Sequence, residues 1–165
     1  MRILLVDDHE MVRLGLKSYL DLQADVDVVA ESADGRAGVE KALELRPDVI
    51  VMDIVMPEMN GIEATLAILK EWPEAQILIL TSYLDNEKIY PVLDAGAKGY
   101  MLKTSSADEI LQAIRKVAKG EIAIETEVSK KVQYHRNHIE LHEDLTARER
   151  DILGLLAKGY ENQRI

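Results

Sequence analysis

Short apolar runs alternate with helical spacing over the first three quarters of the chain. Each run is three or four residues long, too short for a buried helix, and the runs together are rich in branched side chains, which favours strands. The runs are Ile3–Val6, Val28–Ala30, Val49–Met52, Ile77–Leu80 and Tyr100–Leu102. Because they are apolar throughout, without alternating polar residues, the pattern predicts a parallel sheet covered by helices on both faces.

Between these runs, apolar residues recur every three or four positions, which is the spacing of one helix face. Four such stripes are Val12/Leu16/Leu20, Ile62/Leu66/Leu69, Ile89/Val92/Leu93 and Ile110/Ile114/Val117. Before the last stripe, Ser106 and Glu109 have the spacing of a capping box, and Gly120 stands where that helix would end. The strand–helix alternation predicts an α/β domain over residues 1–120, with a five-stranded, doubly wound parallel sheet.

The remaining residues have a different pattern. Residues 121–145 have weak apolar periodicity and are interpreted as a linker. Thr146 and Glu149 then form a second potential capping box, and a short apolar stripe stops at Gly159. We expect residues 146–165 to be the start of an all-α domain that this chain does not complete, because a lone short helix is marginal in water.

Composition agrees with a packed, soluble protein, since 47% of the residues are apolar and 30% are charged. The chain has no cysteine, which excludes a disulfide framework, a Cys-ligated metal and a thiol nucleophile and fits a reducing compartment. No apolar run is long enough to span a membrane. The apolar N-terminal run is followed after four residues by two acids, a pattern that excludes a signal peptide. We therefore expect a cytoplasmic protein.

The net charge of −10 is distributed unevenly. Residues 1–120 carry 13 of the 20 Lys and Arg but 21 of the 30 Asp and Glu, whereas residues 121–165 carry 7 and 9. The acidic first part is unsuited to nucleic acid. The second part lacks the basic excess of a complete DNA-binding domain.

Polar side chains follow four of the predicted strands. Asp7 and Asp8 follow the first strand, Asp53 the third, Thr81 the fourth and Lys103 the fifth. In a doubly wound sheet, ligands bind beyond the carboxyl ends of the strands. We therefore expect these five groups to converge at one edge of the sheet.

Three converging carboxylates define a candidate metal and phosphoryl site. Each pair repels by about 4 kcal/mol at an effective dielectric of roughly 20, and a divalent cation removes this cost. Ligand sets made only of oxygen favour Mg²⁺. Asp53 is then a candidate nucleophile toward a phosphoryl group, with Lys103 and the Thr81 hydroxyl stabilising the phosphoryl oxygens. A single Asp at a strand end is more often a cap or turn residue, so this interpretation depends on the joint pattern.

These residues resemble the receiver domain of bacterial two-component response regulators. The resemblance covers residues 1–120 and rests on Asp7-Asp8, Asp53 with Pro57 and Gly61, Thr81-Ser82, and Lys103. The tail from Leu145 to Asn162 is similar to the opening of a LuxR/NarL-type helix-turn-helix domain. Residues 6–13 and 93–105 are most similar to the LiaR/VraR group of cell-envelope stress regulators.

The resemblance implies a role for each matching position. Asp53 would accept the phosphoryl group, and Lys103 would pair with it. Asp7, Asp8, Asp53 and the backbone carbonyl of Val55 would hold Mg²⁺.

The resemblance also implies a switch, partners and an output. Thr81 and Tyr100 would be the switch residues. A sensor histidine kinase would donate the phosphoryl group, and the product would be a homodimer that regulates transcription without being a turnover enzyme. Promoter DNA would be the partner of a complete protein and is not expected for this chain, because the reading helix of the motif has no room after Gly159.

Two other classes compete with this interpretation. The first is a stand-alone receiver that signals through protein contacts without DNA. The second is a phosphohydrolase of the haloacid dehalogenase type, but that class expects a second Asp at position 55, which is Val.

His9 is a candidate modulator of the acidic site, with a surface position as its default interpretation. His138 and His142 have metal-ligand spacing but are interpreted as part of a solvated linker.

Overall fold

The computed structural model describes residues 1–82, 86–125 and 129–130 of the chain. Strands and helices alternate along residues 2–124. They are β1 (Arg2–Val6), α1 (Glu10–Leu20), β2 (Asp27–Ser32), α2 (Gly35–Leu45), β3 (Val49–Met52), α3 (Gly61–Glu71), β4 (Ile77–Thr81), α4 (Asn86–Asp94), β5 (Gly99–Leu102), α5 (Ala107–Ala118) and β6 (Ala123–Ile124).

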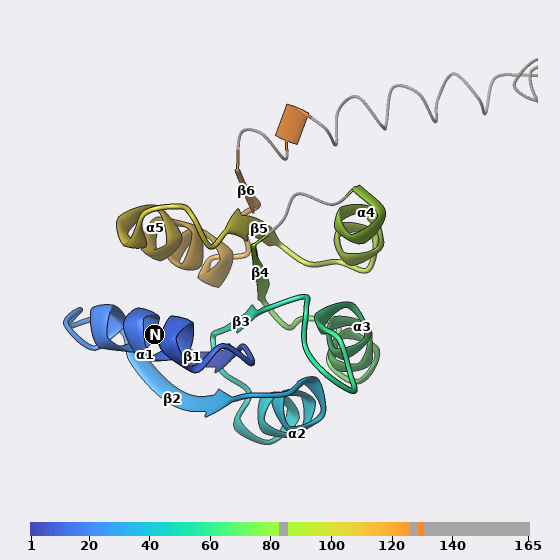
Figure 1. Cartoon of the computed structure of the whole chain (residues 1–165), viewed down its shortest axis with the longest axis horizontal. Helices are drawn as coiled ribbons and strands as arrows, with labels where there is room; N and C mark the ends of the chain where they lie inside the picture. The colour runs from blue at the N-terminus through green and yellow to red at the C-terminus, as the bar shows by residue number, and fades with distance from the viewer. Residues whose placement is uncertain (83–85, 126–128, 131–165) are drawn as a thin grey trace, which may run out of the picture. The chain divides into compact units, whose positions relative to one another are not determined.

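The strands form one sheet in the order β2-β1-β3-β4-β5-β6, and all neighbouring strands are parallel. Helices α1 and α5 cover one face, and α2, α3 and α4 cover the other (Figure 1). The strand order reverses between β1 and β3, so the loops after these two strands lie side by side at the edge where such folds bind ligands. The predicted doubly wound α/β fold is confirmed.

The sheet has six strands rather than the five predicted. The extra strand, β6, falls in the segment interpreted as a linker. It is joined to β5 by the backbone bonds from Ala123 N to the Lys98 carbonyl (2.9 Å) and from Glu125 N to the Tyr100 carbonyl (3.1 Å). The Glu125 carboxylate also accepts the Leu102 N–H at 3.0 Å. A two-residue strand held in this way has no periodicity that a sequence pattern can reveal.

The rest of the predicted linker after Glu125, apart from residues 129 and 130, and the predicted helical segment 146–165 lie outside the described residues.

The sheet core consists of the predicted apolar runs. The side chains of β3 are all buried, as are those of β4. On α5, the predicted stripe Ile110, Ile114 and Val117 is buried against the sheet. The capping box of Ser106 and Glu109 is present in full at its start, where each residue bonds the other's backbone N–H.

Gly61 fixes the loop that follows β3. Its N–H donates to the Ile54 carbonyl at 2.9 Å, and a Cβ at this position would lie 1.9 Å from the Asp53 carbonyl oxygen. Gly61 begins α3 directly after Asn60, whose side chain caps the helix through the N–H groups of Ile62 and Glu63. The loop is therefore closed against the backbone of Asp53 at a distance that only glycine permits.

We expect Gly61→Ala to lower the free energy of unfolding by about 2–3 kcal/mol, because the added methyl forces the backbone of Asp53 or of α3 to move. Urea denaturation measures the change. Gly15→Ala is the matched control, because nothing lies within 4 Å of a Cβ at Gly15 in the middle of α1. The control should gain about 0.5–1 kcal/mol from helix propensity. Equal unfolding midpoints for the two variants would contradict the close approach at Gly61.

Candidate functional site

Two buried carboxylates lie at the carboxyl ends of β1 and β3. Asp7 is 6% exposed and Asp53 is 2% exposed. The Asp7 N–H donates to the Ser32 carbonyl at 3.0 Å, and the Asp53 N–H donates to the Val6 carbonyl at 2.8 Å. The parallel hydrogen-bond ladder thus continues one residue past each strand, which fixes the backbone of both acids. The predicted convergence of Asp7 and Asp53 is what the structure shows.

Lys103 joins the two buried carboxylates. It follows β5, and its own N–H donates to the Thr81 carbonyl at 2.8 Å. Its Nζ lies 2.6 Å from Asp7 Oδ2 and 2.8 Å from Asp53 Oδ2, with 9% of the side chain exposed. One cation therefore balances two acids, and one negative charge of the buried group is left uncompensated.

The site shifts the acidity of these groups. Burial raises the pKa of the Asp53 carboxyl above its usual value, although the hydrogen bond from Lys103 acts in the opposite direction. The nearby Asp7 charge raises it further. Burial by itself would lower the pKa of Lys103, but its hydrogen bonds to Asp53 and Asp7 outweigh burial, and the pKa of Lys103 is raised. The ammonium form is thus the one that the site stabilises.

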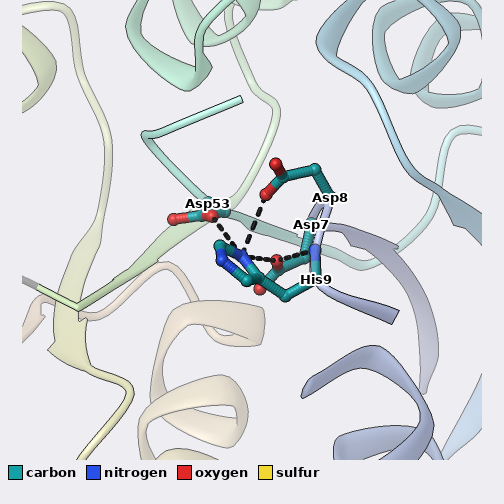
Figure 2. A group of neighbouring side chains, drawn as sticks. All are labelled: Asp7, Asp8, His9 and Asp53. Carbon is teal, nitrogen blue, oxygen red and sulfur yellow. Dashed lines mark hydrogen bonds and ion pairs between the residues drawn. The ribbon is translucent and has the colours of Figure 1, made fainter. Parts of the chain in front are cut away.

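Asp8 and His9 complete the cluster on its solvent side. The Asp8 side chain is 31% exposed, and the His9 ring, 57% exposed, lies among the three carboxylates (Figure 2). His9 Nδ1 lies 2.9 Å from Asp8 Oδ1, 3.2 Å from Asp7 Oδ1 and 3.8 Å from Asp53 Oδ2. The sequence predicts a surface position for His9 by default, and its position directly after Asp8 is the only signal in the sequence for its place in the cluster.

The remaining predicted residues flank this cluster. Thr81 is the last residue of β4 and is 2% exposed; it pairs with Leu102 of β5, one residue before Lys103. Tyr100 is completely buried within β5. The Val55 side chain is 48% exposed, and the Val55 backbone N–H supports the ionised Asp53 by a hydrogen bond.

The cluster fits a divalent cation. One ligand atom from each of Asp7, Asp8, His9 and Asp53 lies within 4.8 Å of all the others. Carboxylate oxygens are the protein ligands that Mg²⁺ prefers, and the exposure of Asp8 leaves room for the waters that Mg²⁺ retains. A cation here would also neutralise the carboxylate charge that Lys103 leaves uncompensated.

An acidic cluster facing a lysine, at the switch point of a flavodoxin-like sheet, defines a class of phosphoryl-accepting domains. The chain belongs to the response regulator receiver domain family, whose model matches residues 3–115. Domains of this family bind Mg²⁺ at such an acidic pocket. The prediction of a two-component response regulator is confirmed.

Among individual proteins, the chain is similar to the response regulator protein VraR of Staphylococcus aureus (strain Mu3 / ATCC 700698). The two are 48% identical over an alignment of 166 positions that covers all of this chain and 79% of VraR. A LuxR-family two-component response regulator from Aurantimonas sp. SI85-9A1 superposes with a TM-score of 0.77 at 36% identity, covering 82% of this chain and 96% of that one. The chain is thus a response regulator of the LuxR type, a group that regulates transcription.

A further solved structure also covers nearly the whole chain. The RcsB response regulator of Salmonella typhimurium, from a study of conformational dynamism for DNA interaction, has a TM-score of 0.74 at 26% identity, with 98% of this chain and 79% of that chain covered.

None of the helices in the described part of our chain is long and apolar enough to cross a membrane.

Proposed function

We propose that the chain is a phosphorylation-controlled response regulator in which Asp53 accepts a phosphoryl group from a sensor histidine kinase. The observation that carries this proposal is the placement of Asp53. Its carboxylate is 2% exposed, yet it faces a lysine ammonium at 2.8 Å and lies in one cluster with Asp7 and Asp8. A structural Asp has no need of both a buried cation and two further carboxylates.

The transfer itself is a displacement at phosphorus. An Asp53 carboxylate oxygen attacks the phosphorus of phosphohistidine or acetyl phosphate, the new O–P bond forms, and the bond to the leaving imidazole or acetate breaks. Asp7, Asp8, Asp53 and the Val55 carbonyl would hold Mg²⁺, which would neutralise charge on the phosphoryl oxygens. Lys103 donates to a phosphoryl oxygen, and the Asp7 carboxylate keeps that ammonium in position.

The switch acts through the neighbouring strands β4 and β5. A phosphoryl group adds a dianion beside Lys103, and the Thr81 hydroxyl moves to donate to it. Because Lys103 N bonds the Thr81 carbonyl, both residues respond as one unit. Tyr100 is the second switch residue, and it is completely buried on β5, the strand that Lys103 follows.

The output is transcription regulation by a homodimer. Its support is the resemblance of the tail to a LuxR-type helix-turn-helix domain and the similarity to VraR and to RcsB, the latter from a study of DNA interaction. By the same resemblance, the signal is cell-envelope stress and the site of action is the cytoplasm. Asp53 is consumed once per phosphorylation, so the chain catalyses its own modification rather than a turnover reaction.

The test combines intact mass with light scattering after incubation with acetyl phosphate and Mg²⁺. We expect one added phosphoryl group and a shift from monomer to dimer, both absent from Asp53→Asn, which keeps the shape of the side chain and removes its nucleophile. Acetyl phosphate that is hydrolysed continuously, without accumulation of phosphoprotein, would instead indicate a phosphohydrolase. Phosphoprotein that stays monomeric would favour a stand-alone receiver.

A further inference from the structure

His9 occupies the N-cap position of α1 but does not act as a cap. N-cap residues are usually Ser, Thr, Asp or Asn, whose side chains accept the free N–H groups of the first helical turn. The His9 side chain makes no such bond. Its ring turns the other way and enters the space among Asp7, Asp8 and Asp53 (Figure 2).

We propose that His9 Nδ1 is a metal ligand, so that this centre is a mixed nitrogen–oxygen site that also takes divalent transition ions such as Ni²⁺, Co²⁺ and Mn²⁺. The proposal deepens the proposed function, because the same cluster would hold Mg²⁺ during phosphoryl transfer. It adds a nitrogen ligand to the oxygen ligands of that centre.

The distances match those between ligands of one ion. With metal–ligand bonds of about 2.1 Å, adjacent ligands at right angles lie about 3.0 Å apart and opposite ligands about 4.2 Å apart. His9 Nδ1 lies 2.9 Å from Asp8 Oδ1 and 3.2 Å from Asp7 Oδ1, which are adjacent positions. The 3.8 Å to Asp53 Oδ2 lies between the two values.

Lys103 and His9 approach different oxygens of Asp7. Lys103 Nζ binds Oδ2 of Asp7 at 2.6 Å, whereas His9 Nδ1 lies on the Oδ1 side of the same carboxylate. At Asp53 both face Oδ2, Lys103 Nζ at 2.8 Å and His9 Nδ1 at 3.8 Å, and the two nitrogens lie 3.5 Å apart. The His9 N–H also donates to Asp7 Oδ1 at 2.8 Å, so the backbone of His9 is tied to the carboxylate that its ring faces. The ring is thereby held at the metal side of the cluster.

A nitrogen ligand changes which ions the centre prefers. Mg²⁺ selects oxygen ligands, whereas imidazole suits Ni²⁺, Co²⁺ and Zn²⁺, and affinity for N/O sites rises along the series from Mn²⁺ to Ni²⁺. Removing the imidazole therefore weakens Ni²⁺ binding far more than Mg²⁺ binding. An unequal loss of Ni²⁺ and Mg²⁺ affinity therefore distinguishes a metal ligand from a residue that only shapes the site.

The experiment measures Ni²⁺ and Mg²⁺ affinity by calorimetry on the full chain without an affinity tag. The background carries Ala at His135, His138 and His142, so that only His9 offers an imidazole. We expect His9→Ala to weaken Ni²⁺ binding at least about 10-fold and Mg²⁺ binding less than about 3-fold. Glu10→Ala, next to His9 on the exposed start of α1, is the matched control and should change neither.

Pulsed electron paramagnetic resonance of the Mn²⁺-loaded chain gives a second readout. We expect modulation from a directly bound nitrogen that is absent in His9→Ala. No nitrogen signal, or an equal loss of Ni²⁺ and Mg²⁺ affinity, would overturn the proposal. Phosphorylation of the His9→Ala chain by acetyl phosphate with Mg²⁺ keeps the two proposals apart, because it tests Asp53 without the imidazole.

Discussion

Chelation of the divalent cation is expected to reduce formation of the Asp53 phosphate by about 100- to 1000-fold. Asp7, Asp8 and Asp53 converge on one point. Among the described residues, Lys103 is the only lysine or arginine whose nitrogen lies within 4 Å of an Asp53 oxygen. An incoming phosphoryl dianion therefore meets net negative charge. A bound cation is worth several kcal/mol of charge stabilisation in such a transfer, and each 1.4 kcal/mol or so is tenfold in rate.

The measurement is the initial rate of phosphoprotein formation from acetyl phosphate, with Mg²⁺ or with EDTA. Restoring excess Mg²⁺ to the chelated sample should recover the original rate, which excludes unfolding as the cause. A rate in EDTA within about threefold of the Mg²⁺ rate would show that the acidic cluster takes no part in transfer.

Lys103→Met is expected to lower the same rate by about 100-fold. Methionine keeps the length of the apolar stem but removes the ammonium that binds Asp53 at 2.8 Å and Asp7 at 2.6 Å. Removing one preformed donor to a developing oxyanion lowers the rate by about 100- to 1000-fold in comparable sites. We expect the lower end of this range, because the divalent cation would still neutralise part of the phosphoryl charge.

Lys119→Met is the matched control, because Lys119 is exposed beyond α5 and lies outside the acidic cluster. It should phosphorylate at the original rate. Urea midpoints measured with Mg²⁺ present show whether each variant is folded. An unchanged rate for folded Lys103→Met would remove Lys103 from the phosphoryl site.

The features that the sequence predicted best are those that recur along the chain. The runs that form β3 and β4 are apolar at every position, and the acids after β1 and β3 stand directly at the ends of such runs. Parallel strands end at one edge, so the convergence of Asp7, Asp53 and Lys103 followed from the fold class alone. The acidic cluster beside Lys103 could therefore be predicted without the structure, and its roles in Mg²⁺ binding and phosphoryl transfer stay predictions.

Two elements of the fold have no periodic signal in the sequence. Helix α2 was given no apolar stripe because the residues that it buries are Gly35, Gly38 and Ala42, which allow close packing but contribute little hydrophobicity. At Gly38 a Cβ would lie 2.7 Å from Val6 Cγ1, which explains the choice of glycine there. Strand β6 was missed because two residues are too few for any alternation.

The orientation of His9 was beyond sequence analysis for a different reason. Its position next to Asp8 placed it near the acids, but a residue at the start of a helix can turn its ring toward the helix or away from it. Three carboxylates from two strand ends attract the ring, and that grouping exists only in the folded chain.

The central claim is that Asp53 carries the phosphoryl group, and reductive mapping tests it most directly. Borohydride converts an aspartyl phosphate to homoserine, and peptide mass spectrometry then locates the converted residue in chain phosphorylated with acetyl phosphate and Mg²⁺. We predict homoserine at position 53 and unmodified Asp at positions 7 and 8. Homoserine at either of those positions with Asp53 intact would contradict the account, as would phosphoprotein in which position 53 remains Asp.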